Sequence, residues 1–298
     1  MTLLFYNRNQ GKGEFYNIID AHGNIDLLKS YSGWRKSWTH IVYSFSPSLL
    51  FYDRSGGAAE FYDLDGQGNI HLVSSTMYST GWTHIILVGV VRDSGHAVLL
   101  FYNAQSGDAK FYRTDGQGGI HLLSSTTFSK GWTHIITNGY EPGAFTQENN
   151  YLVLFYNATS GVAQFYNVDF QGNMHQFSND KWSTGWTHIV PHFAPSMNLF
   201  NLLFYNANSG DAKTYYITEN WSISNTGSTT WAKGWTKILL GDFPLPDEPP
   251  GRTGLALLFY NGSSGTAQFY MTGPGGGVDI SQISNTTWSK GWSEILWF

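Results

Sequence analysis

The feature that most constrains this chain of 298 residues is a motif that recurs six times along it. Each copy opens with an apolar run that ends in Phe-Tyr, and the six tyrosines are Tyr6, Tyr52, Tyr102, Tyr156, Tyr205 and Tyr260. The copies follow one another at intervals of about 50 residues, which is typical of repeat architectures where each copy forms one structural unit. Fold and function must therefore be interpreted from one repeat and from the differences among its copies.

The third copy illustrates what one repeat predicts. Its continuous apolar run, 98–102, is typical of a strand buried on both faces. Three further short segments predict three more strands: 109–113, in which polar and apolar residues alternate, 120–123 after a Gly-rich turn, and 132–136 after a polar loop. No segment has helical periodicity. Four antiparallel strands in each of six repeats predict an all-β fold, a six-bladed β-propeller.

The chain begins with the first strand of a repeat and ends with the fourth, and two arrangements are compatible with this. We expect one domain of six contiguous blades, with the ring closed without a borrowed strand. The expected blades are approximately 1–46, 47–92, 93–142, 143–195, 196–246 and 247–298. The alternative is a phase shift in which the fourth strand of each repeat joins the next blade.

Composition limits the partners. There are 16 Lys and Arg residues against 21 Asp and Glu, with no basic run, so nucleic acid is not predicted as a partner. No apolar run approaches the roughly 18 residues of a membrane span. Abundant amide and hydroxyl side chains, together with 17% aromatic residues, favour a glycan or another neutral small molecule. No signal peptide is expected, because the first predicted strand starts at Thr2; a secreted protein with a trimmed leader and a cytoplasmic protein both remain open.

The repeat also resembles a known class. Gly-Trp-Thr-His-Ile, a loop such as Gly241-Asp242-Phe243, and then Leu-Leu-Phe-Tyr resemble FG-GAP/VCBS-type propeller repeats. The whole-chain organisation is similar to tandem-repeat propeller lectins of the tectonin-like and fucose-binding kinds. This resemblance implies a propeller that binds sugars. The chain departs from it in keeping neither an Asp-rich calcium loop nor an Arg and Glu pair in every copy.

No metal or cofactor is predicted. The chain has no cysteine, and its strand-four histidines, such as His40 and His84, occur one per repeat and would not converge on one ion. No known catalytic motif is found, so the sequence leaves open whether the chain is an enzyme.

Two sets of residues are candidates for binding. The first is an aromatic residue in a polar loop, four positions before a Trp that every copy keeps, which could stack on a sugar or pack as a plug. These residues are Trp34, Tyr78, Phe128, Trp182, Trp231 and Trp288. The second set comes from two long loops that break the six-fold symmetry and would line one pocket at the mouth of a central channel. Its members are Tyr140, Phe145, Phe243, Asp247, Glu248 and Arg252.

Three functions are compatible with these patterns. The leading expectation is a non-catalytic carbohydrate-binding protein, a lectin with repeated shallow sites. The alternative is an enzyme of the lyase or cyclase type that positions an apolar substrate in one aromatic pocket at the channel mouth. The third is a scaffold for protein interactions.

Overall fold

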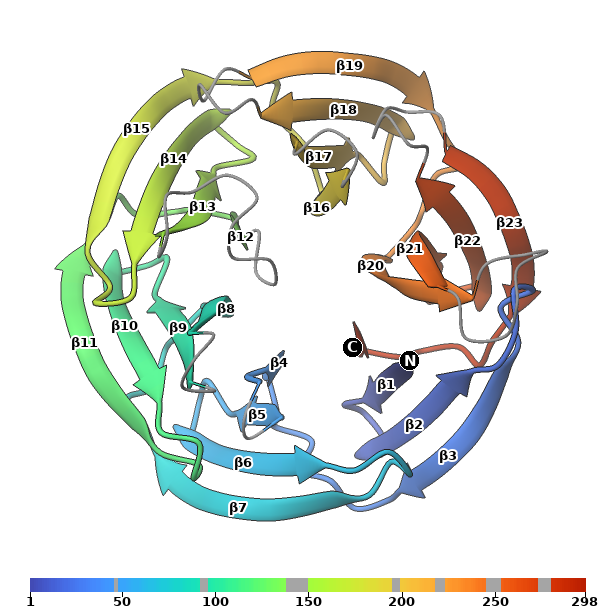
Figure 1. The fold of residues 1–298 in the computed structure, drawn as a ribbon, viewed down its shortest axis with the longest axis horizontal. Helices are drawn as coiled ribbons and strands as arrows, with labels where there is room; N and C mark the ends of the chain where they lie inside the picture. Colours follow the sequence, from blue (N-terminus) through green and yellow to red (C-terminus); the bar gives the residue numbers. More distant parts are fainter. Residues whose placement is uncertain are drawn as a thin grey trace. The chain divides into compact units, whose positions relative to one another are not determined.

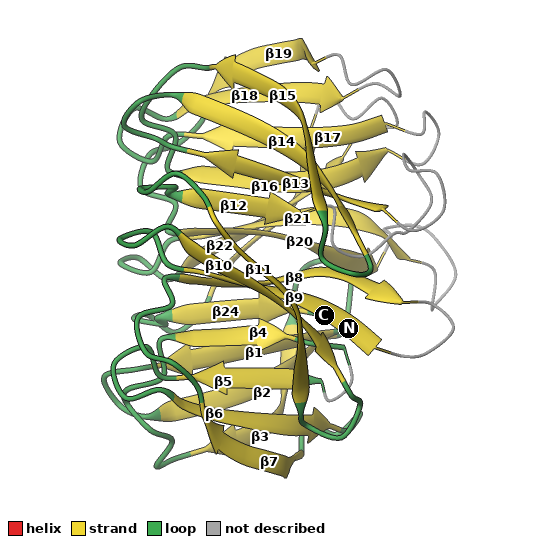
Figure 2. Cartoon of the chain, turned by 90° about the vertical axis from the view of Figure 1, so that its left-hand side faces the viewer, coloured by secondary structure: helices red, strands yellow, loops and turns green. Residues whose placement is uncertain are grey.

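The structure is a computed structural model that describes residues 1–45, 48–91, 96–137, 150–194, 199–217, 223–244, 253–272 and 280–298. These residues form strands, turns and loops, and none of them is helical (Figure 2). A helix able to cross a membrane is accordingly not found in this part of the chain. The chain divides into two compact units, which we describe separately: unit 1 comprises Met1–Lys36, Gly66–Gly68 and Trp186–Phe298, and unit 2 comprises Ser37–Asp65 and Asn69–Gly185.

Unit 1 contains three four-stranded antiparallel sheets, which we number by the repeat that supplies most of each sheet (Figure 1). Blade 1 is β24 (Glu294–Trp297), β1 (Thr2–Asn7), β2 (Lys12–Ile18) and β3 (Ile25–Tyr31). Blade 5 is β16 (His188–Ala194), β17 (Leu199–Tyr205), β18 (Asp211–Ile217) and β19 (Ile223–Thr230). Blade 6 is β20 (Lys237–Pro244), β21 (Thr253–Tyr260), β22 (Thr266–Thr272) and β23 (Ile280–Thr287).

Unit 2 contains the other three sheets. Blade 2 is β4 (His40–Tyr43), β5 (Leu49–Tyr52), β6 (Ala58–Leu64) and β7 (Ile70–Met77). Blade 3 is β8 (His84–Val91), β9 (His96–Tyr102), β10 (Asp108–Thr114) and β11 (Ile120–Thr127). Blade 4 is β12 (His134–Thr137), β13 (Asn150–Tyr156), β14 (Val162–Asp169) and β15 (Met174–Lys181). Six blades of four antiparallel strands make the fold a six-bladed β-propeller, which confirms the predicted class.

The expectation that the propeller closes without a borrowed strand is wrong. In blade 1 the last strand of the chain, β24, pairs with the first, β1, so that Leu3 lies opposite Trp297 and Tyr6 opposite Glu294. The fourth strand of every repeat likewise joins the sheet of the next repeat, and blade 2 therefore runs from His40 to Met77 instead of over 47–92. The fourth strand of one repeat and the first strand of the next are consecutive along the chain, and consecutive strands joined by a loop pair readily as an antiparallel hairpin, as β4 and β5 do.

This phase explains why the Leu-Leu-Phe-Tyr strand is the most apolar. It is a central strand, hydrogen-bonded along both edges, and its residues are buried on both faces. In β5, for example, all four residues are fully buried or nearly so, from Leu49 to Tyr52. The outer strand β3, by contrast, exposes most of its side chains. A strand covered on every side must be apolar at every position. An edge strand can carry polar residues, because part of it faces solvent.

Candidate functional site

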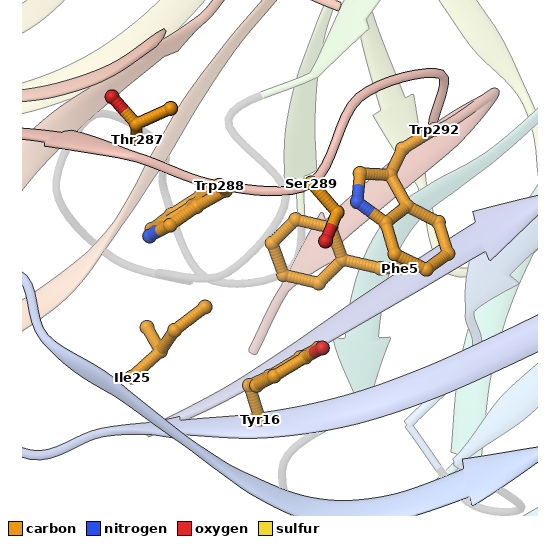
Figure 3. Close-up of a pocket in the computed structure, with 7 residues that line it drawn as sticks. All are labelled: Phe5, Tyr16, Ile25, Thr287, Trp288, Ser289 and Trp292. Carbon is orange, nitrogen blue, oxygen red and sulfur yellow. The ribbon is translucent and has the colours of Figure 1, made fainter. Parts of the chain in front are cut away.

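A pocket of about 190 Å³ lies in unit 1, where the loop between β23 and β24 faces blade 1. We call it the Trp288 pocket. It is lined by Phe5, Tyr16, Ile25, Thr287, Trp288, Ser289 and Trp292. Figure 3 shows Tyr16 and Ile25 approaching from the blade 1 strands, the residues of the loop approaching from the opposite side, and Phe5 between them.

The hairpin glycine of blade 6 holds this loop in place. Gly265 has a φ of +79°, a backbone conformation that glycine adopts without steric cost. Its carbonyl accepts a hydrogen bond of 2.8 Å from the Trp288 N–H. A Cβ atom at position 265 would come within 2.2 Å of the Trp288 carbonyl oxygen. The loop can therefore approach the hairpin this closely only because residue 265 is glycine.

The buried tyrosine of the repeat provides a second anchor. Tyr260 is fully buried, and its hydroxyl donates a hydrogen bond of 2.7 Å to the Ser289 carbonyl oxygen. Its ring also stacks on Trp288, with centroids 6.2 Å apart and planes 27° apart. Because a buried phenol needs a hydrogen-bond partner, the Phe-Tyr motif of one strand fixes the position of a loop that is distant in sequence.

Aromatic rings form most of the pocket wall. Phe5 makes edge-to-face contacts with Tyr16, Trp288 and Trp292, with centroid distances of 5.2, 5.2 and 5.3 Å. Edge-to-face geometry places the positive edge of one ring against the negative face of another. The rings of the wall therefore support one another.

A polar cluster lies behind one wall. The Tyr16 hydroxyl donates a hydrogen bond of 2.7 Å to Oε2 of Glu14. The other carboxylate oxygen, Oε1, is 2.6 Å from Nζ of Lys12 and accepts a hydrogen bond of 3.3 Å from the Ser30 hydroxyl. The Glu14 side chain is only 7% exposed. Lys12, Glu14 and Tyr16 meet because alternate residues of strand β2 point to the same face.

The environment of Tyr16 keeps its hydroxyl protonated. Burial raises the pKa of Tyr16 well above its usual value, and the hydrogen bond to Glu14 and the negative charge of that carboxylate raise it further. A phenol in this state is a hydrogen-bond donor to Glu14, and its oxygen retains lone-pair capacity to accept a hydrogen bond from a molecule in the pocket.

The repeats differ at the position of Glu14. The counterparts in the other five copies are Glu60, Lys110, Gln164, Lys213 and Gln268. Each stands two residues before a Tyr at the position equivalent to Tyr16. Lys12 has as counterparts Ala58, Asp108, Val162, Asp211 and Thr266, and none of these is a lysine. The cluster of a carboxylate, a lysine and a phenol therefore belongs to blade 1 alone, although the aromatic framework is repeated.

The structure places all six predicted loop aromatics in described loops between blades. Trp288 is the most enclosed, with 8% of its surface exposed, and the other five are half-buried. Trp182 stacks on Tyr156 and Trp231 on Tyr205, in the manner of Trp288 on Tyr260. Their use as sugar-stacking platforms stays a prediction, and the small exposed area of Trp288 leaves it little free face for stacking.

Of the predicted channel-mouth residues, only Phe243 lies within the described residues. It is fully buried and packs against Phe269, with centroids 4.5 Å apart, so it belongs to the core of unit 1. The remaining members lie outside the described residues, and they are Tyr140, Phe145, Asp247, Glu248 and Arg252.

The strand-four histidines connect neighbouring blades. In unit 2, Nε2 of His84 is 3.2 Å from the Thr133 carbonyl oxygen at the start of the next blade, and Nδ1 is 2.9 Å from Oγ1 of Thr83. A carbonyl oxygen only accepts, so Nε2 carries a proton. In unit 1, Nε2 of His188 is likewise 3.2 Å from the Thr236 carbonyl oxygen, whereas the last two copies hold an ion pair, Lys237 Nζ to Glu294 Oε2 at 2.7 Å. Within the described ranges, no group of three or more His, Asp or Glu residues could hold a metal ion.

Sequence reasoning identified Trp288 but missed Tyr16 and Glu14. The signal was present: the position of Glu14 is acidic in two copies, basic in two and neutral in two, while the residue two positions later is Tyr in all six. Within one repeat Glu14 looks like an ordinary exposed strand residue. The opposite wall of the pocket, which contains Trp288 and Trp292, comes from the other end of the chain.

Comparisons with known proteins extend the description of the fold. No protein-family model and no curated protein sequence matches the chain. The FG-GAP/VCBS-like and lectin-like type of the repeat therefore stays a prediction.

Solved structures with the same fold are numerous. A periplasmic gluconolactonase of Pseudomonas aeruginosa is 11% identical and has a TM-score of 0.58, and the match covers 99% of this chain and 98% of that one. A candidate 6-phosphogluconolactonase of Bacteroides fragilis is 12% identical, with a TM-score of 0.58 and coverage of 96% and 80%. A protein of unknown function from Desulfotomaculum acetoxidans is 10% identical, with a TM-score of 0.60 and coverage of 97% and 80%. At these identities the likeness establishes the fold.

These findings correct the leading functional expectation. The similar structures named above for an activity are lactonases, which are enzymes, so the non-catalytic lectin is not retained. Of the hypotheses drawn from the sequence, the alternative of an enzyme with one aromatic pocket agrees better with the comparisons.

Proposed function

We propose that this chain is an enzyme that holds one small neutral cyclic molecule in the Trp288 pocket and hydrolyses it, with sugar lactones as the substrate class. The observation that carries the proposal is Tyr16, which lines an aromatic pocket and whose hydroxyl is hydrogen-bonded to the buried carboxylate of Glu14. Aromatic walls position a ring, and a phenol paired with a carboxylate transfers protons. The sequence hypothesis placed the pocket at the channel mouth, and the proposal differs from it in location.

The size of the pocket supports a small substrate. Its volume of about 190 Å³ is below the roughly 300–1,000 Å³ of sites for drug-sized ligands. A single sugar-sized ring suits this space, whereas an oligosaccharide does not. The names of the similar structures make lactones the first class to examine, since a lactone is a sugar-sized ring with a carbonyl group that water can attack.

The charge of the pocket supports a neutral substrate. None of its seven lining residues is Lys or Arg, and the nearby Lys12 is already paired with Glu14. A phosphate group requires cationic or multiple N–H partners. We therefore expect a neutral lactone to react faster than its phosphorylated counterpart.

Proton release in a pH-stat tests the proposal, because lactone hydrolysis produces an acid. The purified chain should hydrolyse glucono-δ-lactone faster than the spontaneous reaction, and 6-phosphoglucono-δ-lactone more slowly than the neutral lactone. Trp288→Phe, which shrinks one wall and keeps a ring there, should raise KM. Rates no faster than buffer for a panel of five- and six-membered sugar lactones would contradict the proposal.

A further inference from the structure

We infer that Tyr16 and Glu14 form a proton relay, in which Tyr16 takes the proton of the attacking water while passing its own proton to Glu14. This inference rests on the proposed function and adds the route by which the proton moves. Tyr16 would be the catalytic residue, because it lines the pocket, and Glu14 would act through it.

The hydrogen bonds of Glu14 assign a different task to each of its oxygens. Oε1 is held by the Lys12 ammonium at 2.6 Å and by the Ser30 hydroxyl at 3.3 Å. Oε2 faces the Tyr16 hydroxyl at 2.7 Å. The first two contacts fix the side-chain rotamer, and the third points one lone pair along the path of the phenolic proton. Lys12 also lies over the pocket-lining Trp292, 5.8 Å from its ring centroid, which restrains the lysine in turn.

The protonation state of Tyr16 determines the order of events. Because its pKa is raised by burial and by Glu14, a free phenolate does not form near neutral pH. The phenol can accept a proton from water only as it gives its own proton to Glu14. The two transfers therefore occur in one concerted step, as general base catalysis through a hydroxyl.

The atoms balance as follows. The water oxygen bonds to the lactone carbonyl carbon, its proton passes to Oη of Tyr16, and the Tyr16 proton passes to Oε2 of Glu14. The ring C–O bond then breaks with its electron pair on the ring oxygen. That oxygen takes a proton from Tyr16 as Glu14 returns its proton to Tyr16. One lactone and one water give one hydroxy acid, and both side chains recover their starting state.

The other repeats provide a natural design for the test. In blade 4 the Tyr166 hydroxyl is 2.9 Å from Oε1 of Gln164, and in blade 6 the Tyr270 hydroxyl is 2.8 Å from Oε1 of Gln268. The fold thus already accommodates a glutamine at this position with the tyrosine hydrogen bond intact. Glu14→Gln should keep the fold and the pocket while removing the carboxylate that accepts the proton.

The experiment measures binding and turnover separately. Binding of gluconolactam, a ring analogue that resists hydrolysis, is followed by tryptophan fluorescence; turnover of glucono-δ-lactone is followed by pH-stat in water and in deuterium oxide. For Glu14→Gln and Tyr16→Phe we expect gluconolactam affinity within about threefold of the parent and a kcat lower by about 100-fold, the lower end of general acid–base contributions. The parent should show a solvent isotope effect on kcat that Tyr16→Phe reduces.

Glu60→Gln is the matched control. Glu60 makes the same contact with Tyr62 in blade 2, at 2.5 Å, and does not line the Trp288 pocket. This variant should keep the parental kcat. If Glu14→Gln and Tyr16→Phe bind and turn over like the parent, the relay is wrong while the proposed function stands. If the parent neither binds gluconolactam nor hydrolyses the lactone, the proposed function fails and the relay with it.

Discussion

Leu3, in the first strand of the chain, lies directly opposite Trp297, in the last strand, across an antiparallel pair. The chain ends meet beside this pair, since the Thr2 N–H donates to the Phe298 carbonyl at 2.8 Å and the Phe298 N–H donates to the Thr2 carbonyl at 3.0 Å. Blade 1 is therefore complete only when both ends of the chain are in place.

Deleting residues 293–298 should prevent stable folding of unit 1. The deletion removes β24, leaves the backbone of β1 without its partner and exposes the apolar face that Trp297 and Ile295 cover. We expect loss of cooperative thermal unfolding, measured by circular dichroism. A circular permutant that joins residues 298 and 1 by a short linker and opens at Gly116, a turn glycine with open space around it, should fold normally. Stable folding of the truncated chain would contradict the closure described above.

Gly241→Ala should destabilise the same region. A Cβ atom at position 241 would come within 2.2 Å of the Trp297 indole, and Trp297 packs against the buried core of unit 1. Overpacking of this kind costs about 1–3 kcal/mol, so the free energy of unfolding should fall by at least that amount. Gly66→Ala places a Cβ where nothing lies within 4 Å. This substitution should change the free energy of unfolding much less than Gly241→Ala does. Equal effects of the two substitutions would refute the steric argument.

Gly265→Ala should damage the Trp288 pocket as well as the fold. A left-handed residue other than glycine costs roughly 1–2 kcal/mol, and the new Cβ would strike the Trp288 carbonyl oxygen. We expect both a lower unfolding temperature and weaker gluconolactam binding. Gly161→Ala in unit 2 makes the matching contact with the Trp182 carbonyl oxygen at 2.2 Å; it should lower the unfolding temperature similarly and leave binding unchanged.

Acid should destabilise unit 2 through His84. Burial lowers the pKa of His84 below its usual value, and the charges of His40, His134 and Arg54 lower it further, against the hydrogen bond to Thr133. The unfolded chain therefore binds a proton more readily than the folded one below about pH 6.5. The stability that His84 contributes is present above that pH and is lost as the pH falls.

The measurement is the thermal midpoint from pH 5 to pH 8 for the parent and for His84→Gln, whose amide keeps an N–H donor and does not titrate. The parent should lose more stability between pH 7 and pH 5 than the variant does. Identical pH profiles would show that His84 is not responsible.

Much of the fold could be predicted from the pattern of residues in one repeat. The apolar run ending in Tyr102 and the Gly-rich turns after it predict strand order within a repeat, because both signals are local. Whether the strand after Trp132 pairs within its own repeat or with the next could not be predicted, because either pairing buries the same side chains. The pairing of β12 with β13 and of β24 with β1 decides that question only when the strands are placed in space.

The candidate site could be predicted only in part. Trp288 is visible in the sequence as a recurrent aromatic four residues before Trp292, and its six-fold recurrence establishes a framework that every blade shares. Tyr16 and Glu14 lie more than 270 residues away in the chain, and each by itself resembles its counterparts in other repeats. Closure of the chain by β24 places the β23–β24 loop against blade 1, and strand alternation turns Lys12, Glu14 and Tyr16 to that side. The sequence by itself therefore determined the six repeated sheets through local periodicity and turn chemistry, whereas the tertiary structure decided which loop aromatic lies beside the cluster of Lys12, Glu14 and Tyr16, because that depends on the pairing of the two ends of the chain.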